Sequence, residues 1–429
     1  MTGDHSLLKR INRMALVRQV KAEPGLSRVE LAHRTGLTKA TVGLLAQELI
    51  GEGWLCESAP ASGQGVGRPR VPLALDPHRM GLLGAEVGVD YLNAVACNLQ
   101  GELLWSRRIP YRPEGVARTA RRLAALVSGA HAELRAQGRR RLGLGVGVPG
   151  AVDVRSGMLR FAPNLGWHDV DLARQLETAL RRAGCGGVPL TVLNEANAAA
   201  LSEYVFGAEP HTAPLVYLSM GIGLGAGVVL RDRLYLGDDG LAGEVGHTIL
   251  QPGGPRCACG RHGCAEAFVS QRAVSRHVTG RDAPILAMDV LAQRVARKDP
   301  AAMRGAKRAG EYLGVLLQNI RNTFNPGVVV LGGPLCQLGD VFVKTALRAM
   351  EANGGRYDYH RASVRLCRFG LNACAIGAAG SVLQDLLHAV DEVGGRPEMP
   401  AAPRRRKAGP RTATPGSREV RGDRHARPA

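Results

Sequence analysis

The stretch that decides the fold runs from Glu244-Val-Gly-His247 to Cys257-Ala-Cys259-Gly-Arg-His-Gly-Cys264-Ala-Glu266. His247 and three cysteines fall within eighteen positions here. Thiolates with one imidazole are typical ligands of Zn²⁺ in a closed tetrahedral site, which leaves no position for water, so we expect a structural ion rather than a catalytic one. Three unrelated buried thiols and an ordinary histidine are the alternative, which the tight spacing disfavours. The expected ligands are His247, Cys257, Cys259 and Cys264.

Glycines and carboxylates complete this stretch. Gly260 and Gly263 allow a short loop to fold back, so that the three thiols converge. Glu244 and Glu266 flank the metal loop on either side. A metal loop between two glutamates favours a site that orients polar groups toward a small hydroxylated ligand.

These motifs resemble the signature of the ROK family, which contains bacterial sugar kinases and sugar-responsive repressors. The resemblance extends over nearly the whole chain. It implies an α/β fold with an actin-like, two-lobed body of the sugar kinase and ribonuclease H type. It also implies that the histidine and the three cysteines hold zinc, and that Glu244, His247 and Glu266 contact the sugar.

Length and composition fit a cytoplasmic protein of several domains. A chain of 429 residues accommodates two or three domains, and its 45% hydrophobic and 22% charged residues are ordinary values. The sequence has no run of eighteen apolar residues and no signal-peptide pattern, so we expect no membrane association. Nine cysteines, three of them in the metal loop, favour reduced thiols over a disulfide framework. The net charge of +19 suits a polyanionic partner.

The N-terminal segment predicts three helices, two of them in a helix-turn-helix. A first amphipathic helix covers residues 7–20. Ser27 and Glu30 form a capping box at the start of a second helix, which Gly36 ends. Thr38 then caps a third helix. Two short helices joined by a glycine-containing turn are typical of a helix-turn-helix.

The pattern from Ser27 to Val42 resembles the winged helix-turn-helix of ROK repressors. The second helix of such a motif presents its N-terminal residues to the major groove, and small or hydroxylated side chains there permit close approach. A helical oligomerisation module is the alternative. The residues expected to contact DNA in this part are Arg28, Thr38, Lys39, Ala40 and Thr41.

A glycine-rich, basic segment follows at residues 63–70. Together with the short apolar stretches on either side, it predicts a two-stranded wing. Arg68 and Arg70 at its tip would enter the minor groove, where arginine reads width and negative potential. A flexible linker is the alternative, and the helix-turn-helix directly before it favours the wing.

From residue 79 the chain alternates strands and helices, which predicts an α/β body. We expect two strands after residue 80, others at 103–111, 142–148, 190–193, 215–219, 228–230, 328–331 and 364–367, a hairpin-like region at 151–168, and helices at 115–137, 171–182, from 197, through 270–324 and at 373–388. The glycine run 221–227 would join two strands, either approaching a phosphate with bare amides or forming a tight hairpin.

Four segments are therefore expected: residues 1–78 as a DNA-binding domain, 79–195 with 373–393 as an N-terminal lobe, 196–372 as a C-terminal lobe with the zinc loop, and 394–429 as a disordered tail. The last 34 residues carry ten Lys or Arg against three Asp or Glu, which contributes +7. Such a tail either adds nonspecific DNA affinity or is simply solvated.

Three motifs of active ROK kinases are altered. The expected Asp-x-Gly-Gly-Thr phosphate turn reads Glu86-Val-Gly-Val-Asp90, which places bulk and negative charge beside a phosphate. The expected Asn-Asp-Ala-Asn reads Asn194-Glu-Ala-Asn197, so the residue in the position of the catalytic base, Glu195, is one methylene longer. Ile222 replaces the threonine of the third motif. Together these changes predict that phosphoryl transfer has been lost.

Positions that match the family's sugar-binding residues are retained. They are Asn164, Asn194, Glu195, Glu244, His247 and Glu266. We therefore expect a sugar-responsive DNA-binding regulator of carbohydrate genes, by default a repressor, that binds a palindromic operator as a homodimer or tetramer and takes a sugar or sugar phosphate as effector. A bifunctional sugar kinase that also binds DNA, and a DNA-binding protein with a vestigial sugar site, are the alternatives.

Overall fold

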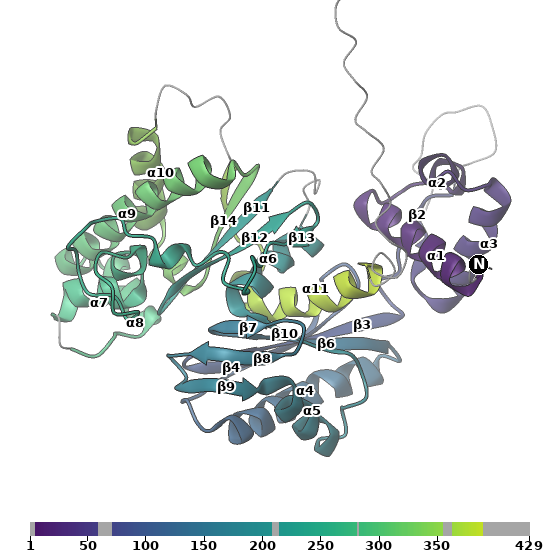
Figure 1. Ribbon diagram of the computed structural model, residues 1–429, viewed down its shortest axis with the longest axis horizontal. Coiled ribbons are helices and arrows are strands. Elements are labelled where there is room, and N and C mark those ends of the chain that lie inside the picture. Colours follow the sequence, from purple (N-terminus) through teal and green to yellow (C-terminus); the bar gives the residue numbers. More distant parts are fainter. Residues whose placement is uncertain (1–4, 59–70, 208–213, 281–282, 355–362, 389–429) are drawn as a thin grey trace, which may run out of the picture.

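The structure, a computed structural model, describes residues 5–58, 71–207, 214–280, 283–354 and 363–388. A small N-terminal head of three helices leads into a larger body built on two five-stranded sheets (Figure 1). The C-terminal helix α11 lies between the two sheets and ends beside the head (Figure 1). The last described helix of the chain thus lies where the head meets the body.

The head contains the predicted helices. They are α1 (His5–Ala22), α2 (Arg28–Thr35) and α3 (Lys39–Glu52), followed by the antiparallel strands β1 (Leu55–Glu57) and β2 (Leu73–Leu75). Ser27 and Glu30 make the predicted capping box, and Gly36 ends α2 with a φ of 72°. Thr38 caps α3 by accepting a bond from Thr41 N. The helix-turn-helix prediction is confirmed, although α1 extends beyond residues 7–20 at both ends.

The two short strands of the head fit the predicted wing. Leu55 pairs with Leu75 and Glu57 with Leu73. The segment that joins them, with Arg68 and Arg70, lies outside the described residues. The predicted tail at 394–429 also lies outside them.

The first sheet of the body has the strand order β10-β6-β3-β4-β5. Its strands are β3 (Met80–Val87), β4 (Tyr91–Cys97), β5 (Leu103–Pro110), β6 (Arg140–Val148) and β10 (Leu190–Asn194). Helices α4 (Val116–Ala136) and α5 (Leu172–Arg182) lie on one side of this sheet, and α11 (Ala373–His388) lies on the other (Figure 1). A small sheet of β7 (Ala151–Asp153), β8 (Met158–Ala162) and β9 (Trp167–Asp171) forms the hairpin-like region.

The second sheet has the order β13-β12-β11-β14-β15. Its strands are β11 (Leu215–Met220), β12 (Leu224–Leu230), β13 (Arg233–Leu234), β14 (Val328–Gly332) and β15 (Ser363–Leu366). The helices of this half are α6 (Glu195–Phe206), α7 (Gln271–Thr279), α8 (Met288–Ala296), α9 (Pro300–Phe324) and α10 (Asp340–Ala352). Helix α6 packs on β11 and β12, and residues of α9 and α10 share a buried cluster with the sheet.

Helices α6 and α11 join the two sheets through very close backbone contacts. A Cβ atom on Gly377 of α11 would lie 1.7 Å from the carbonyl oxygen of Ala198 on α6. On the sheet beneath α11, a Cβ atom on Gly84 or Gly145 would lie 1.8 Å from a carbonyl oxygen of the helix. Only glycine fits at these positions, so α11 is fixed against both its neighbours.

The head shares one hydrophobic core with the body. Leu16, Val17 and Val20 of α1 are fully buried and belong to the same cluster as Leu383 and Leu387 of α11. Burial of this kind is the main favourable term in packing one element on another. The head is therefore packed on the body through α1 and α11 rather than merely tethered to it.

Some predicted boundaries are wrong. Helix α6 begins at Glu195 rather than at residue 197, because Asn194 Oδ1 accepts bonds from the N atoms of Ala196 (2.8 Å) and Asn197 (3.2 Å). Strand β12 begins at Leu224 rather than 228, so most of the glycine run lies within a strand that faces α6. Helix α10 had no counterpart in the prediction.

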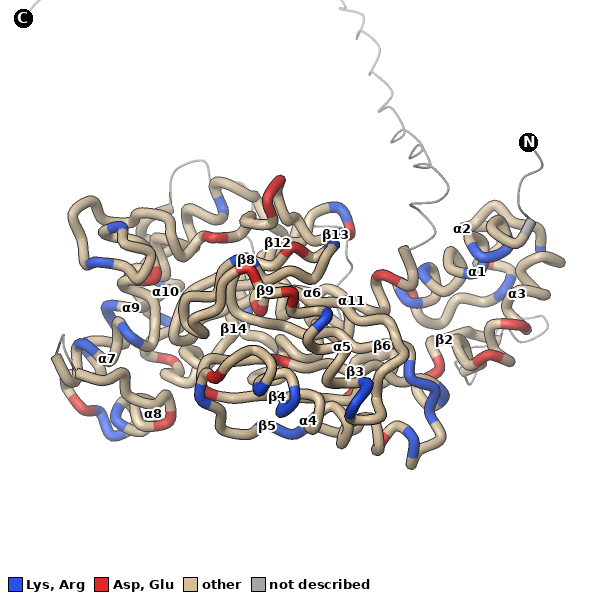
Figure 2. Tube along the Cα trace, turned by 60° about the horizontal axis from the view of Figure 1, so that its bottom comes forward, with Lys and Arg blue, Asp and Glu red and all other residues tan. Residues whose placement is uncertain are grey.

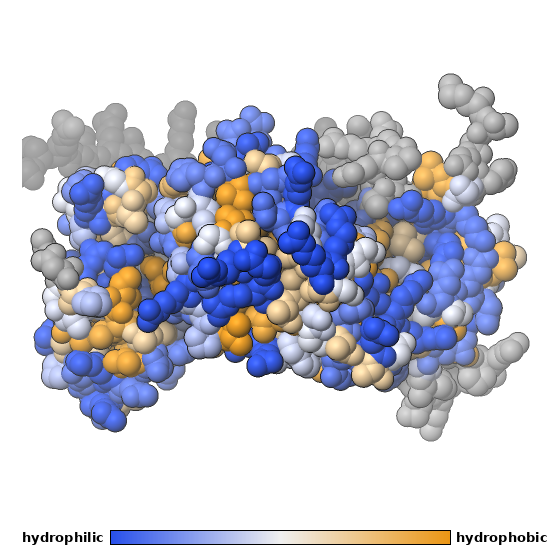
Figure 3. Space-filling model, turned by 90° about the horizontal axis from the view of Figure 1, so that it is seen from below, coloured by the Kyte–Doolittle hydropathy of each residue, from blue (hydrophilic) through white to orange (hydrophobic). Residues whose placement is uncertain are grey.

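Charge is spread over the described part of the molecule. Among these residues, Figure 2 shows Lys and Arg on the head and on both halves of the body, without a single continuous stripe. The face in Figure 3 is mostly hydrophilic, with hydrophobic patches between the charged groups. Within the described ranges, no helix combines the length and the apolar character that a membrane span requires.

The capping box gives a test of the head. Ser27→Ala removes the hydroxyl that accepts from Glu30 N and donates to Glu30 Oε2. We expect the free energy of unfolding to fall by about 1 kcal/mol, as measured by urea titration followed by circular dichroism. Ser27→Thr keeps the hydroxyl and serves as the control. An equal loss in both variants would contradict the capping role.

Candidate ligand cavity and metal cluster

A cavity of about 1060 Å³ lies where the two sheets of the body face each other. Its lining comes from the β3–β4 turn, the start of α6, the β11–β12 turn and the metal loop. The six residues predicted from the sequence to contact a sugar all line it: Asn164, Asn194, Glu195, Glu244, His247 and Glu266. The fold thus gathers positions that span about a hundred residues of sequence around one space.

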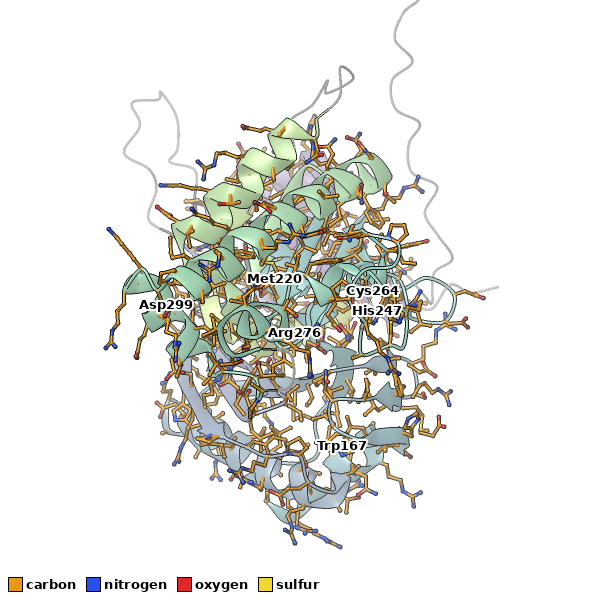
Figure 4. The ribbon with its side chains drawn as sticks, turned by 90° about the vertical axis from the view of Figure 1, so that its left-hand side faces the viewer. Trp167, Met220, His247, Cys264, Arg276 and Asp299 are labelled. Atoms are coloured by element: carbon orange, nitrogen blue, oxygen red, sulfur yellow. The ribbon has the colours of Figure 1, made fainter. Side chains whose placement is uncertain are left out.

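The four predicted metal ligands come together beside this cavity. The ligand atoms of His247, Cys257, Cys259 and Cys264 all lie within 4.8 Å of one another. The Sγ atoms of Cys259 and Cys264 are 3.7 Å apart, and Cys257 Sγ is 3.7 Å from His247 Nδ1. An ion bound tetrahedrally at about 2.3 Å by sulfur separates its ligands by roughly 3.5 to 3.8 Å. The donor set therefore fits a tetrahedral metal ion, and Figure 4 shows His247 next to Cys264.

The metal loop closes because of one glycine in particular. Gly263 has a φ of 77°, and a Cβ atom there would lie 1.7 Å from the carbonyl oxygen of Gln251. Cys257 N donates to the carbonyl oxygen of Arg261 at 2.8 Å, which turns the chain back between the cysteines. A side chain at residue 263 would push the segments around Gln251 and Gly263 apart. The expected role of Gly263 in folding back the loop is confirmed.

The metal cluster also positions two side chains of the cavity. His247 turns Nδ1 toward Cys257, while its Nε2 lies 3.8 Å from a carboxylate oxygen of Glu244. Glu266 accepts a bond from Leu224 N at 3.1 Å and lies 3.6 Å from Cys257 Sγ. A carboxylate on the far nitrogen of a metal-bound histidine fixes the ring orientation. The cluster thus connects the cavity with the start of β12.

Two buried oxygen atoms in the cavity wall lack a hydrogen-bond partner among the described residues. They are Glu86 Oε2 and Asn197 Oδ1, in side chains that are each 4% exposed. A buried polar atom without a partner is costly, so such atoms are candidates to receive hydroxyl groups of a ligand. Sequence reasoning placed both residues in altered kinase motifs but did not include them among the ligand contacts.

The side-chain amides of Asn164 and Asn194, which we predicted to bind the sugar, differ in how many protein partners they already have. Asn194 caps α6 with its oxygen, and its Nδ2 donates to the carbonyl oxygen of Gly150 at 2.9 Å. It therefore orients Glu195 as well as facing the cavity. Asn164 is exposed on the loop between β8 and β9, at the edge of the cavity.

Carboxyl groups crowd the floor of the cavity. Burial raises the pKa of Glu195 to about 8, and the negative charges of Glu86 and Glu244 add to the shift. Burial also raises the pKa values of Glu86 and Glu244 above their usual range. Desolvation and like charges both disfavour the ionised forms, so this group of acids holds protons at neutral pH more readily than free carboxylates do.

Comparison with known proteins identifies the family. The ROK family model matches residues 82–385, which is most of the chain. The chain belongs to the ROK family. The xylose repressor of Caldicellulosiruptor bescii is 29% identical over 399 residues, which cover 90% of this chain and 98% of the repressor.

Solved ROK structures confirm the fold. A ROK family transcriptional regulator, a homologue of the E. coli MLC protein, matches with a TM-score of 0.72 at 25% identity and covers 91% of this chain and all of its own. A ROK glucokinase from Streptomyces griseus, solved with glucose and AMPPNP, matches with a TM-score of 0.62 at 26% identity and covers 71% of this chain and 99% of its own. The predicted actin-like body with an N-terminal helix-turn-helix is therefore confirmed.

The turn that holds phosphate in ROK kinases is occupied here by an aromatic side chain. Tyr91 donates its hydroxyl to Glu86, and a Cβ atom on Gly88 would lie only 2.6 Å from the Tyr91 ring. The guanidinium of Arg108 lies 3.3 Å from the centre of that ring. Sequence reasoning singled out Val89 and Asp90 but missed Tyr91 and Arg108, because their contact depends on the pairing of β4 with β5.

Loss of one thiolate tests the metal cluster. Cys259→Ser is expected to lower the metal content per purified chain and the melting temperature, because a closed four-ligand site stabilises the fold that it holds. Metal content is measured by inductively coupled plasma mass spectrometry. Cys56→Ser, a half-buried cysteine of the head, is the control. Unchanged metal content in Cys259→Ser would contradict this assignment.

The raised pKa of Glu195 predicts how the free energy of unfolding depends on pH. The group binds a proton below about pH 8 in the folded protein and below about pH 4.5 in the unfolded chain. Between these values the folded state holds the extra proton, so its stability falls as the pH rises. Glu195→Gln removes this contribution, and its stability relative to wild type should increase with pH by no more than about 1.4 kcal/mol per unit.

Urea unfolding at several pH values between 5 and 8 measures this difference. Glu177→Gln, at an exposed position on α5, is the control and should follow the wild type. Parallel curves for wild type and Glu195→Gln would show that Glu195 titrates normally.

Proposed function

We propose that this ROK protein is a transcriptional repressor whose affinity for operator DNA is set by a sugar bound in the cavity of the body. The observation that carries the proposal is the joining of a helix-turn-helix head, through a shared core, to a body whose cavity gathers the family's sugar-binding positions. Relatives named xylose repressor match the chain over nearly its full length, which supports the same function.

The head would read DNA with the start of α3 in the major groove. Thr38, Lys39 and Ala40 are exposed there, and the hydroxyls of Thr38 and Thr41 lie 2.9 Å apart. Arg28 on α2 pairs with Glu57 at 2.8 Å and would exchange this partner for a phosphate. A homodimer would present two heads to a palindromic operator, with Arg68 and Arg70 in the adjacent minor groove.

The effector that suits this cavity is an uncharged sugar rather than a sugar phosphate. Glu86, Glu195 and Glu244 face the space together, and whichever of these carboxyls is ionised would repel an anionic group at close range. Two arginines line the space: Arg108 is already stacked on Tyr91, and Arg261 lies beside the thiol of Cys259. Protonated and ionised carboxyls donate to and accept from adjacent hydroxyls, so the same groups suit a neutral polyol. D-Xylose is the first candidate, from the names of the relatives.

Zinc is the metal that we assign to His247, Cys257, Cys259 and Cys264, because three thiolates with one imidazole suit that ion. When bound, zinc would supply a rigid tetrahedral centre with no open position for chemistry. Its function would be to hold the loop that aims His247 and Glu266 at the sugar.

Phosphoryl transfer has been lost in this proposal. The ring of Tyr91 packs on Gly88 in the former phosphate turn, and the neighbouring Asp90 adds negative charge to the same wall. Glu195, with a pKa of about 8, carries its carboxyl one methylene farther from the backbone than the aspartate of the kinases. The likeness to a glucokinase solved with glucose and AMPPNP keeps a sugar kinase as the second candidate.

Operator binding tests the proposal. DNA from upstream of the protein's own gene is titrated with the full-length protein at fixed salt, because phosphate contacts make affinity strongly salt-dependent. D-Xylose, D-glucose and their phosphates are added in parallel. We expect one uncharged sugar to change the operator affinity several-fold and none of the phosphates to do so. A coupled assay with ATP and the same sugars should show no turnover, and turnover would favour the kinase.

A substitution in the head tests whether the start of α3 contacts the operator. Lys39→Ala is expected to weaken operator binding and to reduce the slope of log affinity against log salt by about 1, as for loss of one phosphate contact. Lys307→Ala, an exposed lysine on α9 of the body, is the matched control. Equal affinities for both variants would exclude Lys39 from the DNA interface.

A further inference from the structure

One acidic residue, Asp232, lies where the body meets the head. It occupies the turn between β12 and β13, and the two residues of that turn, Arg231 and Asp232, have left-handed backbone with φ of 49° and 65°. Residues other than glycine adopt this conformation at a cost, and it persists where surrounding contacts hold it. The contacts of Asp232 therefore hold the turn in this conformation.

Two helices bind this turn from different sides. Tyr204 of α6 donates its hydroxyl to Asp232 Oδ1 at 2.5 Å. Gln384 of α11 donates its Nε2 to the backbone oxygen of Asp232 at 2.8 Å. Strand β12, helix α6 and helix α11 thus meet at a single residue.

The same three elements have their opposite ends at the cavity. Helix α6 begins with Glu195, which lines the cavity floor. Strand β12 begins with Leu224, whose N donates to Glu266 beside the metal cluster. Leu371, two residues before α11, also lines the cavity. Each element therefore connects the ligand site directly with the turn at Asp232.

The head contributes a lysine to this junction. Lys21 lies in the last turn of α1 and is half-buried. Burial lowers the pKa of Lys21 to about 8, and the negative charge of Asp232 offsets part of that shift. Helix α1 also contacts α11 and shares its core, so the head is held at this place by packing, with Lys21 near the charge of Asp232.

We propose that Asp232 is the relay between sugar and DNA: a tilt of α6, together with β12, about its close contact with α11 is passed through the contacts of Asp232 with Tyr204 and Gln384, and through the packing of α1 on α11, to the placement of the head. This inference rests on the proposed function. Closing of the two sheets on a sugar displaces helices and strands as rigid bodies. A residue that is hydrogen-bonded to both α6 and α11 converts that displacement into a change at the head. The effect on DNA is then a coupling free energy between two sites.

Three substitutions in the full-length protein test the relay. Asp232→Asn removes the charge and still tolerates the left-handed backbone. Tyr204→Phe removes the hydroxyl that binds Asp232, and Lys21→Met removes the ammonium at similar length. None of these residues lines the cavity or lies at the start of α3. Sugar affinity is measured by calorimetry, and operator affinity by fluorescence anisotropy with and without the sugar that affects the wild type, D-xylose first.

A matched Lys–Asp pair on another surface provides the control. Lys344 and Asp340 on α10 pair at 2.6 Å and are both exposed. Asp340→Asn and Lys344→Met make the same chemical changes far along the body from the junction. We expect these two variants to keep the full response of operator binding to sugar.

In the relay variants we expect sugar affinity and sugar-free operator affinity near those of the wild type. The response to sugar, roughly 5- to 150-fold for coupling of ordinary size, should shrink several-fold. A full response in both Asp232→Asn and Tyr204→Phe would overturn the relay and leave the repressor intact. Loss of sugar binding in these variants would also overturn it, since they would then act at the cavity. A wild type whose operator affinity ignores every sugar would overturn the proposed function, and the relay with it.

Discussion

The close backbone contact between α6 and α11 is the constraint on which the body depends. Gly377 lets α11 approach the carbonyl oxygen of Ala198, and Gly84 and Gly145 let the same helix lie directly on the first sheet. Such contacts leave no space for relative sliding without loss of packing. The two sheets are therefore joined through one pair of helices, and the cavity lies at one end of that pair while the head lies at the other.

The cluster of His247 and the three cysteines lies beside the cavity and shares side chains with it. His247 belongs to both places, with one nitrogen toward Cys257 and the other toward Glu244. Glu266 connects the loop to Leu224 at the start of β12. Strand β12 is bound at its start by Glu266 of the metal loop, and the turn after its end is bound by Tyr204 and Gln384. The strand is therefore a direct physical connection across the second half of the body.

A few side chains distinguish this cavity from the motifs of ROK kinases. Tyr91 fills the phosphate turn, and Arg108 stacks on it from the next strand. Burial raises the pKa values of the carboxyls Glu86 and Glu195, and the negative charge of Glu86 adds to the shift of Glu195. Such groups can donate to and accept from the hydroxyl groups of a sugar.

The sequence by itself determined what depends on neighbours along the chain. Three features were predictable: the capping box at Ser27, the closing helix at residues 373–388 and the set of metal ligands within eighteen positions. Helix ends and metal loops depend on residues that lie close together in the sequence. Only the tertiary structure decided which distant groups meet. The stacking of Arg108 on Tyr91 needed the register of β4 with β5, and the meeting of three elements at Asp232 needed the packing of α6 on α11. No local pattern encodes such contacts, since they form between segments that the whole fold brings together.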